Sequence, residues 1–564
     1  MDPVPSAPAR VFDAATKRYI VKTLTRWSPL VVASLTLALV VALTSPPLRA
    51  GSSRAQHQAG PSLIGGAAGS TQSGGPATST GGNGTGGTSG AVTAGAGVGS
   101  PGTTRTGVNC GPSARQFAWS AYAPVCAPAF HGSNGGATSH GVTGTTITIS
   151  YRKPNSVQQS AAQSLAGDAY PNDDALIADM QTYLRFFNAQ FELYGRKVQL
   201  LPYQGQGDFL QEDQGQGLAA TQADAQSASD EGAFADVTMP LFGSQFYEQD
   251  LAEAGVVAVG GLGFPTQWYQ QYSPYEYSVT PTGTAGADGF VNIACNRMAG
   301  LPAIFAGDSL YQSQVRRFGF IGPDNPEYVA VGDLVQNGLQ QTCGVPLAKR
   351  VTYSINVTSF EQQAVSVVAQ MKQAGVTTVI CGCDPLFPIL LTQAADQQQY
   401  RPEWLGIGWY DPQGRLPAQD QMAHTLSQEG LYPPAASTEA AKVFQMAAPG
   451  SAPQEQYYAV AYYTMLYLFD ALQAAGPNLN PQTFQQGVFS MPASTPGDVG
   501  TWQGGPQAFS PARTTQIGWW NPNATSNFDG KQGAWESCEG GRWFGFLDPN
   551  AWQPDHTQLA CLGR

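Results

Sequence analysis

The sequence predicts an α/β protein with two similar units, each a parallel sheet covered by helices on both faces. Strand-like and helix-like segments alternate strictly over residues 145–282, and the same alternation returns over residues 315–410. Alternation of this kind places helices on both faces of a parallel sheet. The chain has 564 residues, of which 42% are hydrophobic, so it is long enough to bury two cores.

The N-terminus has the features of an export signal. Basic residues between Lys17 and Arg26 precede the apolar run Leu30–Leu43, and Ala50 closes a short segment suited to cleavage. The apolar run is shorter than the roughly 20 residues of a membrane span. Residues 1–50 are therefore predicted to be a cleaved signal peptide or an uncleaved signal anchor. Either way the rest of the chain is exported, and only this segment contacts the membrane.

Residues 51–107 consist almost entirely of Gly, Ser, Thr, Ala, Gln and Pro. Such a segment buries too little apolar surface to offset its ordering entropy, so it is predicted to be a disordered linker that tethers the domain. Residues 108–143 form a cysteine-containing lead-in to the ordered region.

The eight cysteines of this exported chain are compatible with disulfides. Their separations predict the local pairs Cys110–Cys126 and Cys538–Cys561, and the remaining connectivity stays open. Cys381 and Cys383 form one close pair, with no second pair and no histidine at ligand spacing, so no metal site is predicted.

Composition and missing motifs exclude several function classes. Only 12% of the residues are charged and the net charge is −12, which argues against nucleic acid as a partner. The chain lacks GxxxxGK[ST], HExxH and GxSxG, and it has no GxGxxG at a strand-to-helix turn. We therefore expect neither a cofactor nor an enzymatic activity.

In the first unit, β-branched and small polar residues alternate over 144–152, which predicts a strand. Apolar residues at helical spacing predict a helix over Asp173–Leu193, capped by Asn172 or Asp173 and ended by Gly195. The following elements are predicted to be the strand 197–204, the helix Gly217–Glu231, the strand 234–242, the helix Ser244–Ala254 and the strand 255–263.

The second unit repeats this order. Its predicted elements are the strand 316–324, the helix Glu327–Gln341, the strand 349–355, the helix Ser359–Gly375, the strand 377–383, the helix Pro388–Gln399 and the strand 403–409. The helix Glu455–Ala475 is apolar around most of its circumference and is predicted to be buried. Residues 491–564, rich in Gly, Trp and Pro, are predicted to form short strands and loops.

Ligands of open α/β sheets bind outside the carboxyl ends of the strands, so the loops there hold the candidate site. Aromatic side chains with a few polar groups suit a small organic solute. The candidate ligand-binding residues are Phe242, Gly243, Ser244, Phe264, Thr266, Tyr328, Asp384, Trp409, Tyr410 and Asp411. Two of them have a structural alternative, because Ser244 and Asp384 also suit helix caps.

The phrases VTMPLFGS, LAEAGVVAVGG, YSVTPTGTAGADGF, FGFIGPDNPEYVAVG and MKQAGVTTVICGCDP stand in an order that resembles the type I periplasmic binding proteins, in the branch of Leu/Ile/Val-binding and amide-binding receptors. The resemblance covers about residues 141–490. It implies two Rossmann-like lobes joined by a three-stranded hinge, within a solute-binding domain over 144–490. The first lobe would span about 144–282 and 411–485, and the second about 283–410 with part of the tail.

The resemblance also implies roles for the candidate residues. Phe242, Gly243 and Ser244 match the carboxylate loop of the first lobe, and Tyr328 matches a tyrosine of the second lobe. Phe264 and Thr266 match the next loop of the first lobe. The candidates for the partner of a ligand ammonium group are Asp384 and Asp411. Trp409 and Tyr410 are bulkier than the usual glycine-rich turn, and LFGSQ replaces a Ser/Thr-rich run, which departs from the pattern for an α-amino acid.

These inferences predict an extracytoplasmic solute-binding protein of an ABC importer, with a small polar solute (amino-acid, branched-chain amino-acid or amide-like) and a membrane permease as partners. A surface-tethered sensor without a permease is the alternative, and a cell-envelope hydrolase is a further one.

Overall fold

A computed structural model gives the fold and describes residues 97–167, 170–238, 244–261, 263–407, 414–428, 437–527, 529–546 and 557–562. The predicted signal segment and all of the linker before residue 97 lie outside these ranges. None of the helices within them is long and apolar enough to cross a membrane.

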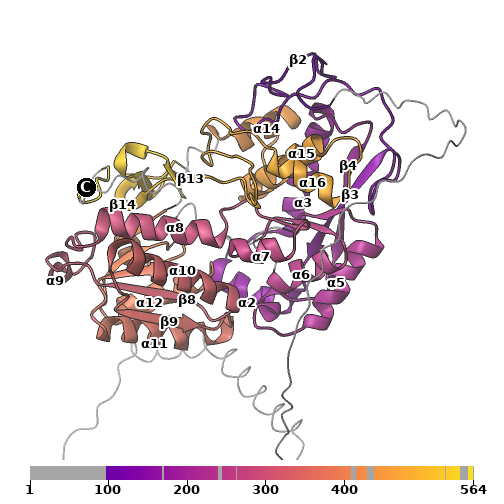
Figure 1. Cartoon of the computed structure of the whole chain (residues 1–564). Coiled ribbons are helices and arrows are strands. Elements are labelled where there is room, and N and C mark those ends of the chain that lie inside the picture. The colour runs from indigo at the N-terminus through magenta and orange to yellow at the C-terminus, as the bar shows by residue number, and fades with distance from the viewer. Residues whose placement is uncertain are drawn as a thin grey trace, which may run out of the picture. The chain divides into compact units, whose positions relative to one another are not determined.

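Five parallel strands form the first sheet, in the spatial order β4-β3-β5-β6-β7. Figure 1 labels its strands β3 and β4. The strands are β3 (Thr146–Lys153), β4 (Lys197–Gln204), β5 (Ala235–Asp236), β6 (Val257–Val259) and β7 (Glu276–Tyr277). The helices between them are α2 (Ser156–Ala166), α3 (Asp173–Gln190), α4 (Phe209–Glu212), α5 (Leu218–Asp230), α6 (Gln245–Glu253) and α7 (Thr266–Gln271). This sheet and its helices are called the first lobe.

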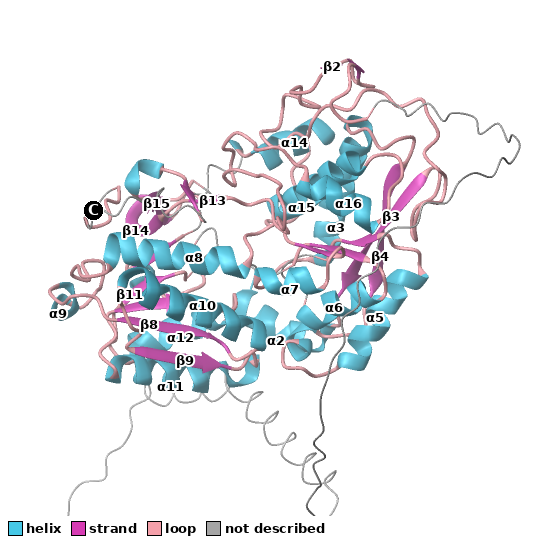
Figure 2. Cartoon of the chain, in the orientation of Figure 1, coloured by secondary structure: helices cyan, strands magenta, loops and turns pink. Residues whose placement is uncertain are grey.

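Seven strands form the second sheet, in the order β15-β14-β12-β11-β10-β8-β9 (Figure 2). The strands are β8 (Phe318–Pro323), β9 (Lys349–Tyr353), β10 (Thr378–Cys381), β11 (Glu403–Leu405), β12 (Thr425–Ser427), β14 (Gly518–Thr525) and β15 (Gln532–Ser537). Strands β8 to β12 are parallel, and β14 and β15 add an antiparallel hairpin.

The second sheet and the elements packed on it are called the second lobe. Its helices are α8 (Gly283–Ile293), a π-helix (Ala294–Met298), α9 (Ser309–Gln312), α10 (Pro326–Cys343), a 3₁₀ turn (Val357–Ser359), α11 (Phe360–Gln373), α12 (Phe387–Gln397) and α13 (Gln419–Met422). Strand β12 lies beyond residue 410, where the sequence places the end of this lobe. Its partner is β11, so the second lobe continues at least to Ser427.

The chain then returns to the first lobe and leaves it again. Helices α14 (Glu439–Ala447) and α15 (Tyr458–Ala475) pack against α3, and α16 (Pro481–Phe489) packs against α15. The tail afterwards supplies β14 and β15 to the second sheet. The tail also forms the pair β13 (Thr514–Thr515) and β16 (Phe544–Gly545) and the 3₁₀ turn Glu539–Gly541. Three passages between the lobes follow from this order, and their action as a hinge remains a prediction.

Alternating strand residues build a core on each face of each sheet. In the second sheet Phe320 and Ile380 face α8 and α10, while Ile321 and Val379 face α11 and α12. The first sheet packs α3 and α14–α16 on one face and α5 and α6 on the other. Since successive strand residues point to opposite faces, a sheet covered on both sides reads as a continuous apolar run. The predicted two-lobed α/β class is confirmed.

The end of the first long helix differs from the prediction. Helix α3 begins as expected, with the Asn172 side chain accepting a hydrogen bond from the Ala175 amide, but it ends at Gln190 rather than near Gly195. Phe191 is already extended and is buried among aromatic rings of α3 and α15, so core packing ends the helix before the glycine is reached.

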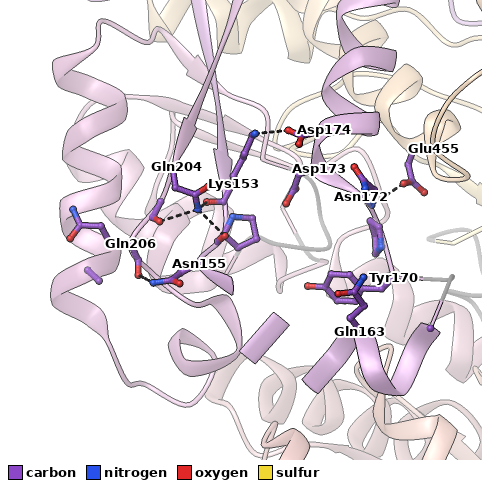
Figure 3. A pocket seen from close by; sticks show the side chains of 15 residues that line it. Lys153, Asn155, Gln163, Tyr170, Asn172, Asp173, Asp174, Gln204, Gln206 and Glu455 are labelled. Carbon is purple, nitrogen blue, oxygen red and sulfur yellow. Dashed lines mark hydrogen bonds and ion pairs between the residues drawn. The ribbon is translucent and has the colours of Figure 1, made fainter. Parts of the chain in front are cut away.

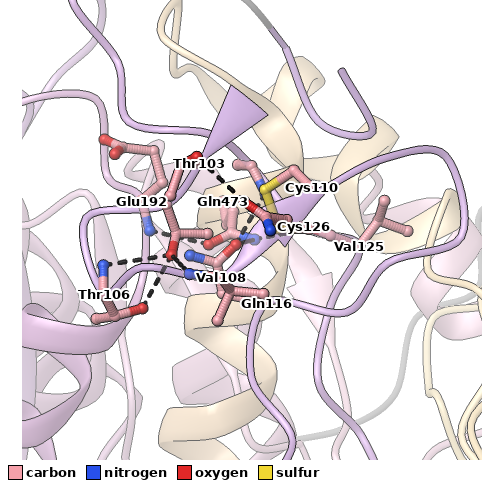
Figure 4. The surroundings of a disulfide bond; sticks show 12 residues. Thr103, Thr106, Val108, Cys110, Gln116, Val125, Cys126, Glu192 and Gln473 are labelled. Carbon is pink, nitrogen blue, oxygen red and sulfur yellow. Dashed lines mark hydrogen bonds between the residues drawn. A yellow bond between two sulfur atoms is a disulfide. The ribbon is translucent and has the colours of Figure 1, made fainter. Parts of the chain in front are cut away.

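The lead-in packs against the first lobe (Figure 4). It carries β2 (Asn109–Cys110) and the Cys110–Cys126 disulfide. Strand β2 pairs with β1 (Gly102–Thr103), which lies in the last part of the segment predicted to be a disordered linker, so this part of the prediction differs from the structure. The Gln473 side chain of α15 donates to Gln116 Oε1 at 3.2 Å and to the Val125 carbonyl at 2.9 Å. Its Oε1 accepts a hydrogen bond from the Glu192 amide at 2.9 Å, so one buried glutamine joins the lead-in to the end of α3.

Both predicted disulfides, Cys110–Cys126 and Cys538–Cys561, are confirmed. The structure adds Cys295–Cys343, which joins the π-helix after α8 to the end of α10, and Cys381–Cys383 at the carboxyl end of β10. The described residues include no free cysteine and no cluster of three or more side chains suited to a metal ion.

Candidate functional site

A pocket of about 1010 Å³ lies at the carboxyl ends of β3 and β4, the first two strands of the first sheet (Figure 3). It is lined by Lys153, Pro154, Asn155, Gln163, Gly167, Tyr170, Pro171, Asn172, Asp173, Asp174, Gln204, Gly205, Gln206, Ala220 and Glu455. Most of these residues are polar, and amides predominate among them. We call this cavity the polar pocket.

Backbone bends at the ends of two adjacent strands shape one wall of the polar pocket. The Gln204 side-chain amide donates to the carbonyl oxygens of Lys153 and Pro154, at 3.3 and 3.1 Å. The Asn155 side-chain amide donates to the Gln206 carbonyl at 2.9 Å. Each amide side chain therefore ties its own loop to the neighbouring loop, which fixes both loops at the edge of the sheet.

The N-terminus of α3 forms the opposite wall. The Asn172 backbone amide donates to the Glu455 carboxylate at 2.8 Å, and the Tyr151 hydroxyl donates to Asp173 at 2.7 Å. Lys153 and Asp174 form an ion pair at 2.5 Å. The side chain of Asp174 is mostly exposed, so this pair contributes little to stability and leaves the ammonium group accessible.

Helix α2 forms the third side of the polar pocket and also contacts the second lobe. Gln163 and Gly167, one helical turn apart, line the pocket. Ala162 is fully buried in the core cluster that includes Phe360 and Val367 of the second lobe, and Leu165 packs against the same cluster. The helix therefore presents one face to the cavity and another to the opposite lobe.

A second contact between the lobes follows α4. The Asn325 side-chain amide, just before α10, donates to the Asp213 carbonyl of the first lobe. Leu210 of α4 is buried in the same second-lobe cluster as Ala162. Burial raises the pKa of the Asp213 carboxyl well above its ordinary value, and the nearby carboxylates Glu212 and Asp384 act in the same direction.

A buried ionic cluster holds α4 in this place. The Arg152 guanidinium donates to both carboxylate oxygens of Glu212, at 2.9 and 3.1 Å, and lies 3.4 Å from Asp224. The same guanidinium lies over the Tyr247 ring, 3.6 Å from its centroid. The Ser244 hydroxyl donates to Glu212 at 2.6 Å, so the cluster connects β3, α4, α5 and α6 beneath the loops of the first lobe.

Of the predicted residues in the first lobe, Ser244 is fully buried and its hydroxyl is bonded twice. It accepts from the Tyr247 amide at 3.1 Å as the cap of α6 and donates to Glu212. Phe264 is buried against Trp268, with ring centroids 4.4 Å apart. Thr266, at the first turn of α7, is half-buried, and its amide donates to the Thr284 hydroxyl at 3.0 Å.

In the second lobe, Asp384 is also occupied by structural bonds. One oxygen accepts from the Leu386 and Phe387 amides at the start of α12, and the other accepts from the Tyr353 hydroxyl at 2.5 Å. Burial raises the pKa of this carboxyl. Tyr328 is half-buried in the first turn of α10.

The predicted residues Phe242, Gly243, Trp409, Tyr410 and Asp411 lie outside the described residues. Ser244 is the N-cap of the structural alternative. Asp384 accepts from the Leu386 and Phe387 amides, but the N-cap of α12 is Leu386. A contact with solute stays a prediction for every candidate residue.

The sequence reasoning did not single out the residues of the polar pocket. The signal was present, because Lys153 directly follows the first predicted strand, Gln204 ends the second, and the carboxyl-end rule applies to them as to the later strands. No local sequence pattern indicates the contribution of Glu455, because its carboxylate accepts a hydrogen bond from the amide of Asn172, which lies 283 residues away.

Comparisons with known proteins agree on the fold. The family model described as Periplasmic binding protein matches residues 163–518. Similar solved structures include an ABC-transporter solute-binding protein from R. palustris in complex with 4-hydroxybenzoate, with TM-score 0.50, 12% identity and coverage of 69% of this chain and 95% of that chain.

Two further structures show the same likeness. A solute-binding protein from Rhodopseudomonas palustris HaA2, in complex with p-hydroxybenzoic acid, has TM-score 0.51 and 13% identity and covers 72% of this chain and 98% of that chain. An ABC-transporter substrate-binding protein from Aeropyrum pernix has TM-score 0.51 and 12% identity and covers 73% and 100%. No curated protein sequence matches the chain significantly.

Proposed function

Because the chain belongs to the periplasmic binding protein family, we propose that it is the extracytoplasmic solute-binding protein of an ABC importer and that it captures a small polar solute. The observation that carries this proposal is the family match, which spans residues 163–518 and so includes strands of both sheets. The members of this family bind substrates for transport, and this chain accordingly delivers its solute to a membrane permease without chemical change. Export of the chain places it on the outer side of the membrane, either anchored or secreted.

The proposed solute site is the polar pocket together with the predicted loops at the carboxyl ends of the later strands. Amide side chains both donate and accept hydrogen bonds, which suits an amino-acid or amide-like solute. Lys153 supplies a positive charge for a solute carboxylate. Thr266 and Tyr328, which are half-buried, are proposed to contact the solute by their side chains. The helix cap Ser244 and the carboxylate of Asp384, which binds the Leu386 amide, are proposed to position the backbone of their loops.

Helix α2 is proposed to link capture to the lobes. Its Gln163 face lines the polar pocket and its Ala162 face packs in the second lobe, so a solute that orders α2 also favours contact between the lobes. A ligand shifts a conformational equilibrium only through a difference in its affinity for the two states. Because α2 lines the polar pocket and also packs against the second lobe, a solute bound there would have different affinities for the states with and without contact between the lobes.

A thermal-shift screen of the purified chain against amino acids, short amides, urea and aromatic acids tests the proposal. A ligand that binds only the folded state stabilises it by about 2.7 kcal/mol at 100 times its dissociation constant. We expect a shift from at least one class and a smaller shift in Lys153→Ala. Lys197→Ala is the matched control, because Lys197 starts the adjacent strand at the opposite end.

The outcomes separate the candidate functions. If no class of compound shifts the melting temperature, the result counts against small-solute capture. If Lys153→Ala and the parent chain show equal shifts, the polar pocket is not part of the solute site. A bound solute recovered chemically changed would favour the hydrolase. Binding by a chain whose genome encodes no neighbouring permease would favour the surface-tethered sensor.

A further inference from the structure

The loop that follows β4 rests on the buried ionic cluster of the first lobe. We call Gly205, Gln206 and Gly207 the pocket loop, because Gly205 and Gln206 line the polar pocket. The backbone amides of Gln206 and Gly207 donate to the two carboxylate oxygens of Asp224, at 2.8 and 2.9 Å. Asp224 lies on α5 and is only 1% exposed. One buried carboxylate therefore holds two consecutive amides of the pocket loop.

The two glycines of the pocket loop permit this close contact. A Cβ atom at Gly205 would lie 2.8 Å from Asp224 Oδ2, and one at Gly207 would lie 2.2 Å from Glu212 Oε1. Neither glycine has a left-handed backbone, so other residues could adopt the same backbone angles. The contact with the ionic cluster is therefore what excludes a side chain at these two positions.

Arg152 keeps the carboxylate of Asp224 in place. Its Nη1 atom lies 3.4 Å from Asp224 Oδ2 and 2.9 Å from Glu212 Oε1, and all three side chains are buried. A carboxylate that accepts two backbone amides and also faces a cation has most of its acceptor sites occupied, so it has little freedom to move. The position of the pocket loop is therefore set by the buried interior of the first lobe.

The pocket loop in turn holds the start of α2. The Asn155 backbone amide donates to the Gly207 carbonyl at 2.9 Å. Its side-chain amide donates to the Gln206 carbonyl, also at 2.9 Å (Figure 3). Asn155 is the N-cap residue of α2, yet its side chain makes no cap bond to the helix. Asparagine is one of the preferred N-cap residues, so the bond to the pocket loop replaces the usual cap bond here.

We propose that Asp224 is a positioning residue of the polar pocket, which it shapes without lining it. Its carboxylate fixes the pocket loop, and the pocket loop fixes the start of α2, whose residues Gln163 and Gly167 line the cavity. Two walls of the polar pocket thus depend on one buried group. The inference rests on the proposed function in that the polar pocket is the solute site.

Hydrogen–deuterium exchange of the full chain, followed by mass spectrometry, measures how firmly the pocket loop is held. In Asp224→Asn the side chain keeps one acceptor oxygen, and its NH₂ group faces a backbone amide that also donates. We expect peptides that contain Gln206 and Gly207 to exchange about tenfold faster, because bonds to a charged acceptor are lost. Peptides from the start of α2 should follow. Peptides from α11 in the second lobe should keep the parent rate, which separates lost positioning from a general loss of stability.

Gly207→Ala is a second variant, which leaves Asp224 intact. Its methyl group would meet Glu212 Oε1, so it should displace the pocket loop from the cluster and give the same pattern of faster exchange, also where Asp224→Asn does not fold. Gly111→Ala is the matched control, because a Cβ atom there has no atom within 4 Å beyond its chain neighbours. Asp230→Asn, at the exposed end of α5, is the control for the lost charge. Both controls should exchange like the parent chain.

Binding of L-glutamine, which combines an amino acid with an amide, gives a second measurement by isothermal titration calorimetry. Asp224→Asn and Gly207→Ala should weaken this binding about fivefold or more, because the pocket is no longer preorganised, while both controls bind like the parent chain. Parent rates of exchange in the pocket loop of both variants, or equally faster exchange in α11, would overturn the inference. A parent chain that binds none of the screened compounds would contradict the proposed function, and the exchange rates would still decide the role of Asp224.

Discussion

Arg152 shows how strongly single residues of the first lobe depend on buried charge. Its side chain and that of Glu212 have no exposed surface, and the two groups are joined by two hydrogen bonds. Arg152→Met would leave Glu212 buried without its cation. Removing one partner of such a pair costs about 3–5 kcal/mol, so we expect a loss of this size in the free energy of unfolding by urea.

Arg401→Met is the control for this loss. Arg401 pairs with Asp420 in the second lobe, but 36% and 68% of the two side chains are exposed. Exposed pairs contribute about 0–1 kcal/mol. Equal losses in the two variants would show that the Arg152 cluster contributes no more than a surface pair.

The role of a single polar side chain near a helix start could not be predicted from the sequence. A Ser or Asp before a helix suits both a cap and a ligand contact, and the sequence left both roles open for Ser244 and Asp384. The structure shows their bonds to backbone amides at the starts of α6 and α12. Which role a polar side chain takes depends on burial and on distant partners such as Glu212 or Tyr353, and neither is encoded nearby.

At the scale of elements, the long strands and helices were predictable because their apolar residues repeat with a clear period. Helix α8 was not predicted, because Gly283, Gly286 and Gly289 lower its helix propensity. The structure explains two of these glycines. A Cβ atom at Gly283 would lie 2.3 Å from the Gly263 carbonyl, and one at Gly289 would lie 2.2 Å from the Gln428 side chain. Close packing by distant residues overrides local preference here.

The contact of helix α2 with the second lobe can be tested by substitution. Ala162→Asp would place a charge in the apolar cluster that joins α2 to the second lobe, and burying an unpaired charge is strongly unfavourable. We expect the lobes to separate, with an increase in the radius of gyration measured by small-angle X-ray scattering. Ser164→Asp, on the exposed side of the same helix, should leave the radius unchanged. A compact Ala162→Asp variant would contradict the linking role of α2.

For the whole molecule, the two-lobed class followed from the order of elements, whereas the route of the chain between the lobes did not. Strand β12 pairs with β11 and also with β14, and the pairing with β14 joins residues about 90 positions apart, such as Leu426 and Trp519. Periodicity within a segment contains no information on such pairings. The contribution of Glu455 to the polar pocket was unpredictable for the same reason, since it comes from a segment distant from the α3 N-terminus to which it is bonded.

The disulfides provide a prediction at this scale. In the chain-entropy account, a bond that closes a longer loop stabilises the folded state more. Cys295–Cys343 spans 48 residues and Cys381–Cys383 spans 2. We expect losses of about 4 kcal/mol for the double serine variant of the first pair and about 1.5 kcal/mol for that of the second, measured by urea unfolding. A larger loss for the second pair would show that it has a local structural role.

The lead-in has a mechanical consequence. A pull applied to the chain ahead of residue 97 reaches the lead-in first, and the Cys110–Cys126 bond carries that load past the 15 residues between the two cysteines. Beside Cys126, the Val125 carbonyl accepts from Gln473 of α15, whose Oε1 accepts from the Glu192 amide after α3, so the load passes to the core of the first lobe. The second lobe therefore lies outside the line of force. A tethered molecule held by this end would keep its freedom to close.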